Sequence, residues 1–137
     1  MFKKIFILLT IIILLSNKVI AENKYEIIIN INSQIITNFD IKKETKYLFA
    51  LNPSLDNLSK KQIKEISKKS LIREKIKENE ILKYYIINYE DPQLAIFLIN
   101  IYKRLGIVDE AEFNTYLSKF GLDISSVTKK IAIERAW

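Results

Sequence analysis

The chain has two glycines and two prolines among its 137 residues, and each stands where a helix would begin or end. Asn52-Pro53 closes one helical stretch and Asp91-Pro92 opens another, because proline lacks an N–H and its fixed φ suits a first helical turn. Gly106 and Gly121 each follow an apolar stretch, and glycine readily takes the left-handed conformation that closes a helix. The long stretches between these four residues are free to be helical, so we predict a mainly α fold.

Polar residues that cap helices mark the other starts. Ser59-Lys-Lys-Gln62 is a capping-box pattern, Asp91 precedes the proline, Asp109-Glu-Ala-Glu112 repeats the cap pattern, and Asp123 precedes Ile124. Such side chains accept hydrogen bonds from the first free amides of a helix. The predicted helices cover about residues 39–51, 60–85, 92–105, 110–120 and 124–137.

The segment before the first helix has β character. Tyr25–Ile31 is rich in isoleucine, and Gln34–Thr37 is a second short run behind an Asn32-Ser33 turn. Thr37 or Asn38 then caps the first helix, with Asp40 in its first turn. Two short strands are marginal by themselves in water, so they must pack on the helices or on a further strand. We therefore predict a bundle of about five helices opened by a short N-terminal β-hairpin or strand pair.

The apolar spacing predicts which helix faces are buried. In the first helix the inner residues are Ile41, Thr45, Leu48 and Phe49, and the mostly exposed ones are Lys42, Lys43, Glu44 and Lys46. In the longest helix the inner residues are Ile63, Ile66, Leu71, Ile76, Ile81 and Leu82. The stretch LAIFLINIY at 94–102 is too hydrophobic for one exposed face. We expect it to be the buried centre of the bundle or part of a hydrophobic interface.

The first 21 residues are similar to a secretory signal peptide. Lys3 and Lys4 precede the apolar run Ile5–Leu15, which is short for a bilayer span, and Val19-Ile-Ala21 offers a cleavage site. We expect cleavage after Ala21 and export, with an uncleaved membrane anchor as the alternative. Residues 22–137 then form one domain. Their nineteen basic and sixteen acidic residues give a net charge of +3, too small and too evenly spread to indicate a nucleic-acid partner.

The chain has no cysteine and no histidine, which excludes thiol nucleophiles, Cys/His zinc sites and histidine bases within it. Two glycines are too few for a glycine-rich phosphate loop. Carboxylate pairs, Glu78 with Glu80 or Glu90 with Asp91, remain as the one generic hydrolase option. Their Lys and Asn neighbours favour solvated surface instead. We predict no enzyme activity, no cofactor and no metal.

Several short stretches, taken in order, resemble the N-terminal domain of SurA-type periplasmic chaperones. Ile29–Asn32 with Ile35–Thr37 and Asp40-Ile41 is similar to the strand, turn and first-helix entry of that family. The later segments that agree with its long helix and its final two helices are Leu71–Ile76, Leu105–Ile107, Asp109-Glu110, Leu117–Asp123, Val127 and Ile131. The resemblance covers most of residues 24–137.

The resemblance implies an ATP-independent holding chaperone in the periplasm of a Gram-negative-type bacterium. Its partners would be unfolded outer-membrane proteins or aromatic-rich extended peptides. Family members continue into parvulin-type prolyl isomerase domains and a C-terminal segment that packs back on the N-terminal domain. No isomerase residues are present here. The hairpin without a third strand and the last helix without a stop signal both predict a covering segment, a homodimer, or a separate C-terminal or isomerase partner.

A holding chaperone needs an apolar surface rimmed by charges. The candidate client-binding residues are Tyr47, Phe49, Tyr84, Tyr85, Tyr89, Phe97, Ile101, Tyr102, Phe113, Tyr116 and Phe120. Each can instead be a core residue, and a core position is favoured for Phe49, Phe97 and Ile101. The stretch 84–89 is either a buried inter-helix loop or an exposed apolar rim. The alternative function is a membrane-tethered scaffold that binds one folded partner.

Overall fold

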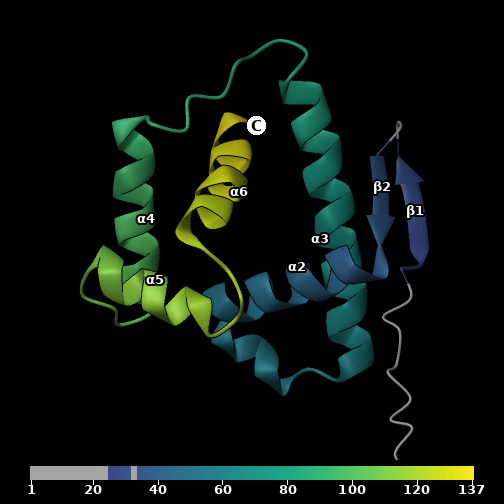
Figure 1. Cartoon of the computed structure of the whole chain (residues 1–137), viewed down its shortest axis with the longest axis horizontal. Coiled ribbons are helices and arrows are strands. Elements are labelled where there is room, and N and C mark those ends of the chain that lie inside the picture. The colour runs from purple at the N-terminus through teal and green to yellow at the C-terminus, as the bar shows by residue number, and fades with distance from the viewer. Residues whose placement is uncertain (1–24, 32–33) are drawn as a thin grey trace, which may run out of the picture.

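The computed structural model describes residues 25–31 and 34–137 (Figure 1). The predicted signal peptide and the Asn32-Ser33 turn lie outside the described residues. In the described part, a two-stranded antiparallel sheet precedes five α-helices, which confirms the predicted fold class. The elements are β1 (Ile27–Ile31), β2 (Gln34–Thr37), α2 (Asn38–Leu51), the 3-10 helix η1 (Pro53–Asn57), α3 (Lys60–Ile81), α4 (Pro92–Arg104), α5 (Glu110–Ser118) and α6 (Ile124–Ala136).

The helix starts follow the predicted caps. Thr37 and Asp40 form a reciprocal capping box at α2, and Ser59 and Gln62 form another at α3. The side chains of Asp91, Asp109 and Asp123 accept backbone N–H groups at the starts of α4, α5 and α6. Gly106 and Gly121 have φ of 76° and 66°, the left-handed conformation that favours glycine. The main boundary error is at α3, which ends at Ile81, before the predicted Tyr84 or Tyr85.

The helices α3 and α4 stand on opposite sides of α6, and α2 runs below α6 and crosses α3 (Figure 1). The loop 82–91 arches from the end of α3 to the start of α4, over the C-terminal end of α6. The hairpin lies beside α3, on the side away from α4 and α5. Its register pairs Ile29 with Ile36 and Ile31 with Gln34.

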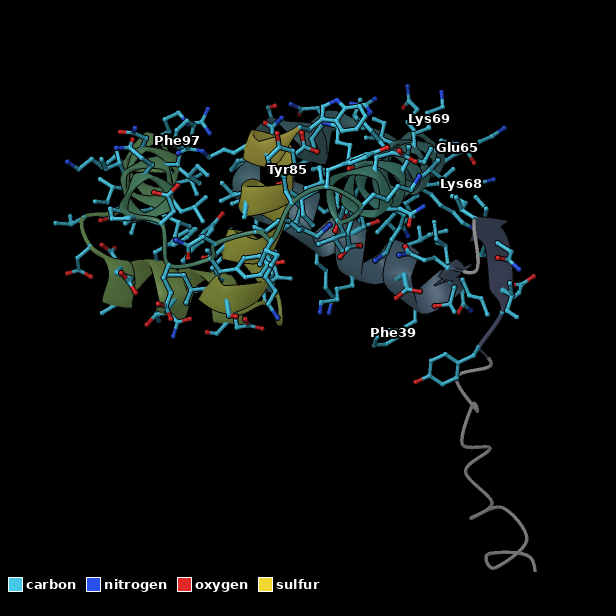
Figure 2. The ribbon with its side chains drawn as sticks, turned by 90° about the horizontal axis from the view of Figure 1, so that it is seen from above. Phe39, Glu65, Lys68, Lys69, Tyr85 and Phe97 are labelled. Carbon is cyan, nitrogen blue, oxygen red and sulfur yellow. The ribbon has the colours of Figure 1, made fainter. Side chains whose placement is uncertain are left out.

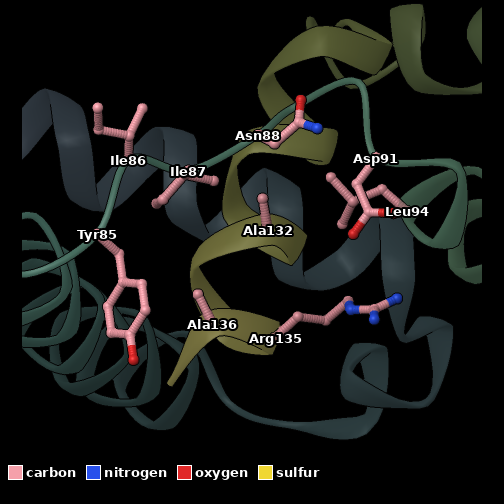
Figure 3. A pocket seen from close by; sticks show the side chains of 9 residues that line it. All are labelled: Tyr85, Ile86, Ile87, Asn88, Asp91, Leu94, Ala132, Arg135 and Ala136. Carbon is pink, nitrogen blue, oxygen red and sulfur yellow. The ribbon is translucent and has the colours of Figure 1, made fainter.

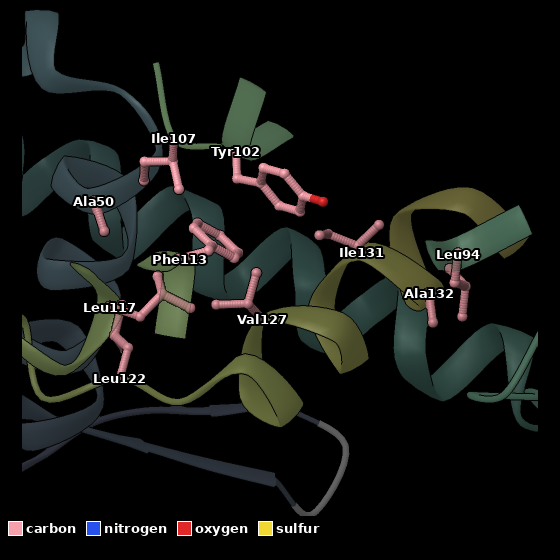
Figure 4. Packing of buried hydrophobic residues seen from close by; sticks show 10 residues of the cluster. All are labelled: Ala50, Leu94, Tyr102, Ile107, Phe113, Leu117, Leu122, Val127, Ile131 and Ala132. Atoms are coloured by element: carbon pink, nitrogen blue, oxygen red, sulfur yellow. The ribbon is translucent and has the colours of Figure 1, made fainter. Parts of the chain in front are cut away.

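Two groups of buried apolar residues hold these elements together. The larger one, called the main cluster, joins the end of α2 to α4, α5 and α6 (Figure 4). It consists of Ala50, Leu94, Tyr102, Ile107, Phe113, Leu117, Leu122, Val127, Ile131 and Ala132. The smaller one, the hairpin cluster, consists of Ile36, Ile41 and Leu71. The hairpin is thus held to α2 and α3 by few fully buried side chains.

A charged layer lies between α2, α3 and α6. The Lys130 Nζ donates to Glu44 Oε2 at 2.7 Å and also pairs with Glu74. Beside it, the hydroxyls of Thr45 and Ser67 lie 2.7 Å apart. We call Glu44, Glu74 and Lys130 the charged triad. Burial raises the pKa of Glu74, and the charge of Lys130 opposes that shift.

Several buried-face predictions are wrong. Glu44, predicted to be exposed, is only 1% exposed, because Lys130 reaches it from α6. Three apolar residues predicted to be on the inner face of the longest helix are exposed: Ile66 and Ile76 in α3, and Leu82 just after it.

The stretch 94–102 is not the centre of the bundle. Only Leu94 and Tyr102 of α4 are buried, while Ile96 and Phe97 are exposed. The helix lies at one edge of the molecule (Figure 1), so part of its surface has no neighbouring element to pack on. No helix in the described ranges, 25–31 and 34–137, is long and apolar enough to cross a bilayer.

Candidate functional site

The structure separates the predicted client-binding residues into three groups. Tyr84, Tyr85, Tyr89 and Phe97 are exposed. Those that are half-buried are Tyr47, Phe49, Ile101, Tyr116 and Phe120. The two buried ones, Tyr102 and Phe113, belong to the main cluster. The predicted core position of Phe97 is therefore wrong, because its side chain is 44% exposed.

The buried and half-buried aromatics have packing partners that explain their positions. The rings of Tyr102 and Phe113 are 5.6 Å apart inside the main cluster. The Tyr116 and Phe120 ring centres are 5.3 Å apart in a tilted arrangement, and the Tyr116 hydroxyl donates to the Ala50 carbonyl at 2.9 Å. These side chains stabilise the fold, so the candidate binding surface narrows to the four exposed aromatics.

Two of the exposed aromatics, Tyr84 and Tyr85, line hollows beside the loop 82–91, and the Arg135 side chain connects one of these hollows to Phe97. Between this loop and the last turns of α6 is a groove of about 380 Å³, which we call the arch groove (Figure 3). The residues that line it are Tyr85, Ile86, Ile87, Asn88, Asp91, Leu94, Ala132, Arg135 and Ala136. Ile86 is 99% exposed at its rim. An apolar side chain at such a position gains nothing from the fold, so it favours a binding role.

A second hollow continues the arch groove towards α3. It has a volume of about 310 Å³, and its lining residues are Glu80, Ile81, Tyr84, Tyr85, Ala136 and Trp137. Tyr85 and Ala136 line both hollows, so the two are neighbours. Together they form one apolar surface that spans the ends of α3 and α6 and the start of α4.

Cationic side chains border this apolar surface. The Arg135 guanidinium carbon lies 4.2 Å from the centre of the Phe97 ring, and the Lys77 Nζ lies 5.8 Å from the Trp137 ring. Lys77 also pairs with Glu134 at 2.7 Å. Cations over aromatic rings keep those rings at the surface without covering them completely. The surface therefore combines apolar side chains with charged ones, and Glu80, Asp91 and Arg135 are among its lining residues.

A second set of exposed apolar residues lies at the hairpin and the start of α2. It consists of Tyr25, Ile27, Ile35 and Phe39, all exposed, and we call it the hairpin patch. The Tyr25 and Phe39 rings are 6.0 Å apart. Figure 2 shows Tyr85 and Phe97 along one side and Phe39 on the opposite one. The two apolar surfaces are thus separate, so substitutions in one can serve as controls for substitutions in the other.

The predicted carboxylate pairs have structural partners. Glu78 pairs with Lys75 at 2.9 Å and Glu80 with Lys83 at 2.6 Å. Asp91 Oδ1 accepts the Gln93 N–H at 2.9 Å as the cap of α4. None of these arrangements places a carboxylate ready to transfer a proton. In the described part of the chain, no group of three or more acidic side chains is placed to hold a metal ion.

The charged triad is a carboxylate pair that the sequence did not suggest. Glu44 and Glu74 line a hollow of about 500 Å³ between β2, α2, α3 and α6. Both carboxylates pair with the same Lys130 amine, and Glu44 is sealed from solvent. This geometry suits a structural ion pair rather than acid–base chemistry.

Several residues of the apolar surface were missing from the sequence-based candidates, among them Ile86, Arg135 and Trp137. Ile86 lies inside the conspicuous stretch 84–89, so its neighbours already marked it. Arg135 and Trp137 lie in a helix end that meets the loop only in the folded chain, and no local pattern indicates that meeting.

Comparisons with known proteins do not place the chain in a family. No protein-family model matches it, and neither a curated protein nor a solved structure matches it. The resemblance to SurA-type chaperones therefore stays a prediction.

Proposed function

We propose that this chain is an exported, ATP-independent holding module that binds unfolded outer-membrane proteins in the periplasm of a Gram-negative-type bacterium. The observation that carries the proposal is the apolar surface at the loop 82–91. Tyr84 is 79%, Tyr85 69% and Trp137 63% exposed. Monomeric proteins rarely leave such a continuous apolar surface uncovered unless something binds to it.

The surface suits extended, poorly specified ligands better than one compact molecule. Its hollows are shallow and neighbouring rather than enclosed, and its aromatic side chains come from a loop and two helix ends. Tyrosine and tryptophan bind apolar and polar groups alike, because each combines a large ring with a hydrogen-bonding group. A charged border formed by residues such as Lys77 and Arg135 would keep a loaded complex soluble.

The test is suppression of aggregation. A urea-unfolded outer-membrane β-barrel protein is diluted into buffer with the chaperone candidate, and light scattering is followed, with a folded soluble protein in place of the candidate as control. We expect suppression at a near-stoichiometric ratio. The variant Tyr85→Ser/Phe97→Ser should lose it.

A matched control removes the same two residue types elsewhere. Tyr25→Ser/Phe39→Ser disrupts the hairpin patch and should retain suppression. If this control loses suppression while the first variant retains it, the binding surface is the hairpin patch. If the wild-type protein is folded by circular dichroism and suppresses nothing, the proposal fails and a scaffold for one folded partner is favoured.

A further inference from the structure

Positive charge is concentrated in one part of the folded chain. The segment 60–73, at the start of α3, holds six basic residues and a single acidic one, Glu65. Residues 22–137 as a whole hold nineteen basic and sixteen acidic residues, so the remainder of the domain is slightly acidic. The small net charge of the domain therefore conceals one strongly basic helix segment.

The charges of this segment are not paired within the protein. The salt bridges of α3 lie beyond it, for example Lys75 with Glu78 and Lys77 with Glu134. Across the ranges 25–31 and 34–137, no side chain of the segment 60–73 takes part in a salt bridge. The two parts of one helix thus differ, because the cations of the second part neutralise nearby carboxylates and those of the first do not.

Unpaired cations at this spacing weaken the helix that carries them. Lys60, Lys64 and Lys68 follow one another at i, i+4 spacing, where like charges repel and destabilise a helix. In the described part of the chain, no carboxylate lies within salt-bridge distance of these three amines. A partner of opposite charge would relieve the repulsion, so the segment favours an anionic binding partner.

Apolar side chains lie on the same surface as the cations. Ile66 is 38% and Ile76 43% exposed, and with Lys69 and Arg73 they recur at i, i+3, i+7 and i+10, which makes one stripe along the helix. The buried residues of α3 lie on another side of it. Figure 2 shows Lys68 and Lys69 projecting outwards from α3. The stripe and the neighbouring lysines, which we call the α3 face, consist of Lys64, Ile66, Lys68, Lys69, Arg73 and Ile76.

A flat anionic surface suits the α3 face better than a small molecule. None of its six residues lines any of the three hollows described above. The segment 60–73 is continuous helix and is therefore about 20 Å long. Along such a face, lysine ammonium groups can reach lipid phosphates, while lysine stems and isoleucine side chains contact the apolar region beneath the headgroups.

A nucleic acid suits the α3 face less well. The bases of single strands bind largely by stacking on aromatic rings, and α3 has no aromatic residue. The exposed Ile66 and Ile76 would find no apolar partner along a phosphate backbone. A lipid bilayer provides such a partner beneath its headgroups.

We propose that the α3 face docks the protein on the surface of a bilayer that contains anionic phospholipids. The helix lies parallel to the surface, with its lysines and Arg73 at the lipid phosphates and with Ile66 and Ile76 at the boundary with the acyl chains. The inference goes beyond the proposed function, because it assigns the protein a place at a membrane surface and requires no unfolded client.

The experiment measures partition into lipid vesicles of the protein purified in the form that cells make from the whole sequence. One set of vesicles is phosphatidylcholine alone, and in the other about a quarter of the lipid is phosphatidylglycerol. Lipid is titrated and bound protein is separated by flotation. We expect a larger partition coefficient for the anionic vesicles, and a smaller difference at high salt. A retained N-terminal apolar segment would attach to both vesicle types, so the ratio of the two coefficients is compared.

The variant that tests the cations is Lys64→Gln/Lys68→Gln/Lys69→Gln. It should lower the partition coefficient for anionic vesicles on the order of 100-fold, since each lysine near an anionic surface contributes several-fold. Its suppression of aggregation should equal that of the wild type, because the arch groove is unchanged. Circular dichroism verifies that the variant is folded.

Two further variants make the test specific. Lys103→Gln/Arg104→Gln/Lys119→Gln removes the same net charge from exposed positions at the ends of α4 and α5 and should bind anionic vesicles nearly as the wild type does. Ile66→Ser/Ile76→Ser keeps every charge of the α3 face and should lower the partition coefficient on the order of tenfold.

Other outcomes overturn the proposal. Equal partition of the wild type into both vesicle types would show that anionic lipid is not recognised. An equal loss in the two charge variants would mean that net charge, and not the α3 face, attracts the protein. Tighter binding to a single-stranded oligonucleotide than to anionic vesicles, unaffected by the isoleucine substitutions, would identify a nucleic-acid partner instead. None of these results affects the proposed holding function, which the aggregation assay tests separately.

Discussion

The main cluster and the charged triad hold neighbouring parts of the same bundle by different means. The main cluster joins α2, α4, α5 and α6 through ten buried apolar residues. The triad joins α2, α3 and α6 through two carboxylates and one lysine amine, and Glu44 Oε1 within it is buried without a hydrogen-bond partner among the described residues. Beyond the triad, three buried side chains hold the hairpin.

This difference predicts which parts of the fold are insensitive to changes of pH and salt. Apolar packing tolerates changes of pH and salt, because its free energy depends on area removed from water. A buried ion pair depends on every member being present, since removing one member leaves an unpaired charge in a medium of low dielectric constant. We therefore expect the side of the molecule at α4, α5 and α6 to be insensitive to pH, and the contact between α2, α3 and α6 to be sensitive.

The largest expected effect comes from emptying the main cluster. Phe113 is fully buried against Tyr102, so Phe113→Ala should lower the free energy of unfolding by about 4 kcal/mol. Urea denaturation followed by circular dichroism measures this loss. The control is Phe39→Ala at an exposed ring, which should cost about 0.5 kcal/mol. Similar losses in the two variants would contradict the assignment of the main cluster as the core.

The next largest loss of stability is expected from removing Lys130, the cation that Glu44 and Glu74 share. Lys130→Met leaves Glu44 and Glu74 close together without a positive partner, and we expect a loss of about 3 kcal/mol in the free energy of unfolding. Urea denaturation at neutral pH measures it. Lys129→Met, at an exposed neighbouring position, serves as the control and should cost about 0.5 kcal/mol.

A rescue variant makes the test of the triad stricter. Replacing all three members by apolar residues, as Glu44→Leu/Glu74→Leu/Lys130→Met, should recover most of the stability lost in Lys130→Met, because no buried charge is left unpaired. If the triple variant is no more stable than the single one, the loss arises from the missing lysine side chain rather than from the unpaired buried carboxylates.

The helix boundaries were predictable because caps are local. Thr37 with Asp40, and Ser59 with Gln62, bond to backbone amides within three residues of themselves. Such contacts can be predicted from the local sequence, because they do not depend on how the rest of the chain folds. Gly106 and Gly121, which follow helix ends with a positive φ, were predictable for the same reason.

The buried faces and the candidate surface were less predictable because they depend on distant partners. Glu44 is buried only because Lys130, 86 residues later, neutralises it. Phe97 is exposed because α4 lies at an edge of the bundle, and Arg135 reaches it from α6. The tyrosines at 84 and 85 were visible from the sequence as a conspicuous stretch. Their association with the end of α6 was not, since no local pattern encodes it.

A smaller loss of stability is expected from removing one hydrogen bond beside the main cluster. The Tyr116 hydroxyl donates to the Ala50 carbonyl at 2.9 Å and so ties α5 to the end of α2. Tyr116→Phe keeps the ring on Phe120 and removes this bond, for an expected loss of about 1 kcal/mol. Urea denaturation at several pH values between 5 and 8 should give the same loss throughout. A loss that varies over this range would mean that the region also contains a titrating contact.

The smallest expected effect is a change in how the free energy of unfolding depends on pH, and it tests the charged triad directly. Burial raises the pKa of Glu74 in the folded protein, although the charge of Lys130 opposes the shift. The folded state therefore binds the Glu74 proton more tightly than the unfolded state does. The resulting stabilisation is fully present below the pKa of an unfolded glutamate, about 4.3, and is lost as pH rises through the higher folded value.

Glu74→Gln has no proton to lose and should lack this decline. The free energy of unfolding of the wild type, minus that of Glu74→Gln, should therefore be greatest near pH 4 and fall as pH rises, as urea denaturation at a series of pH values would show. Lys130→Met removes the charge that opposes the shift, so the decline should be steeper in that background. A difference that grows with pH would mean instead that Lys130 outweighs burial and that the ionised carboxylate is the stabilised form.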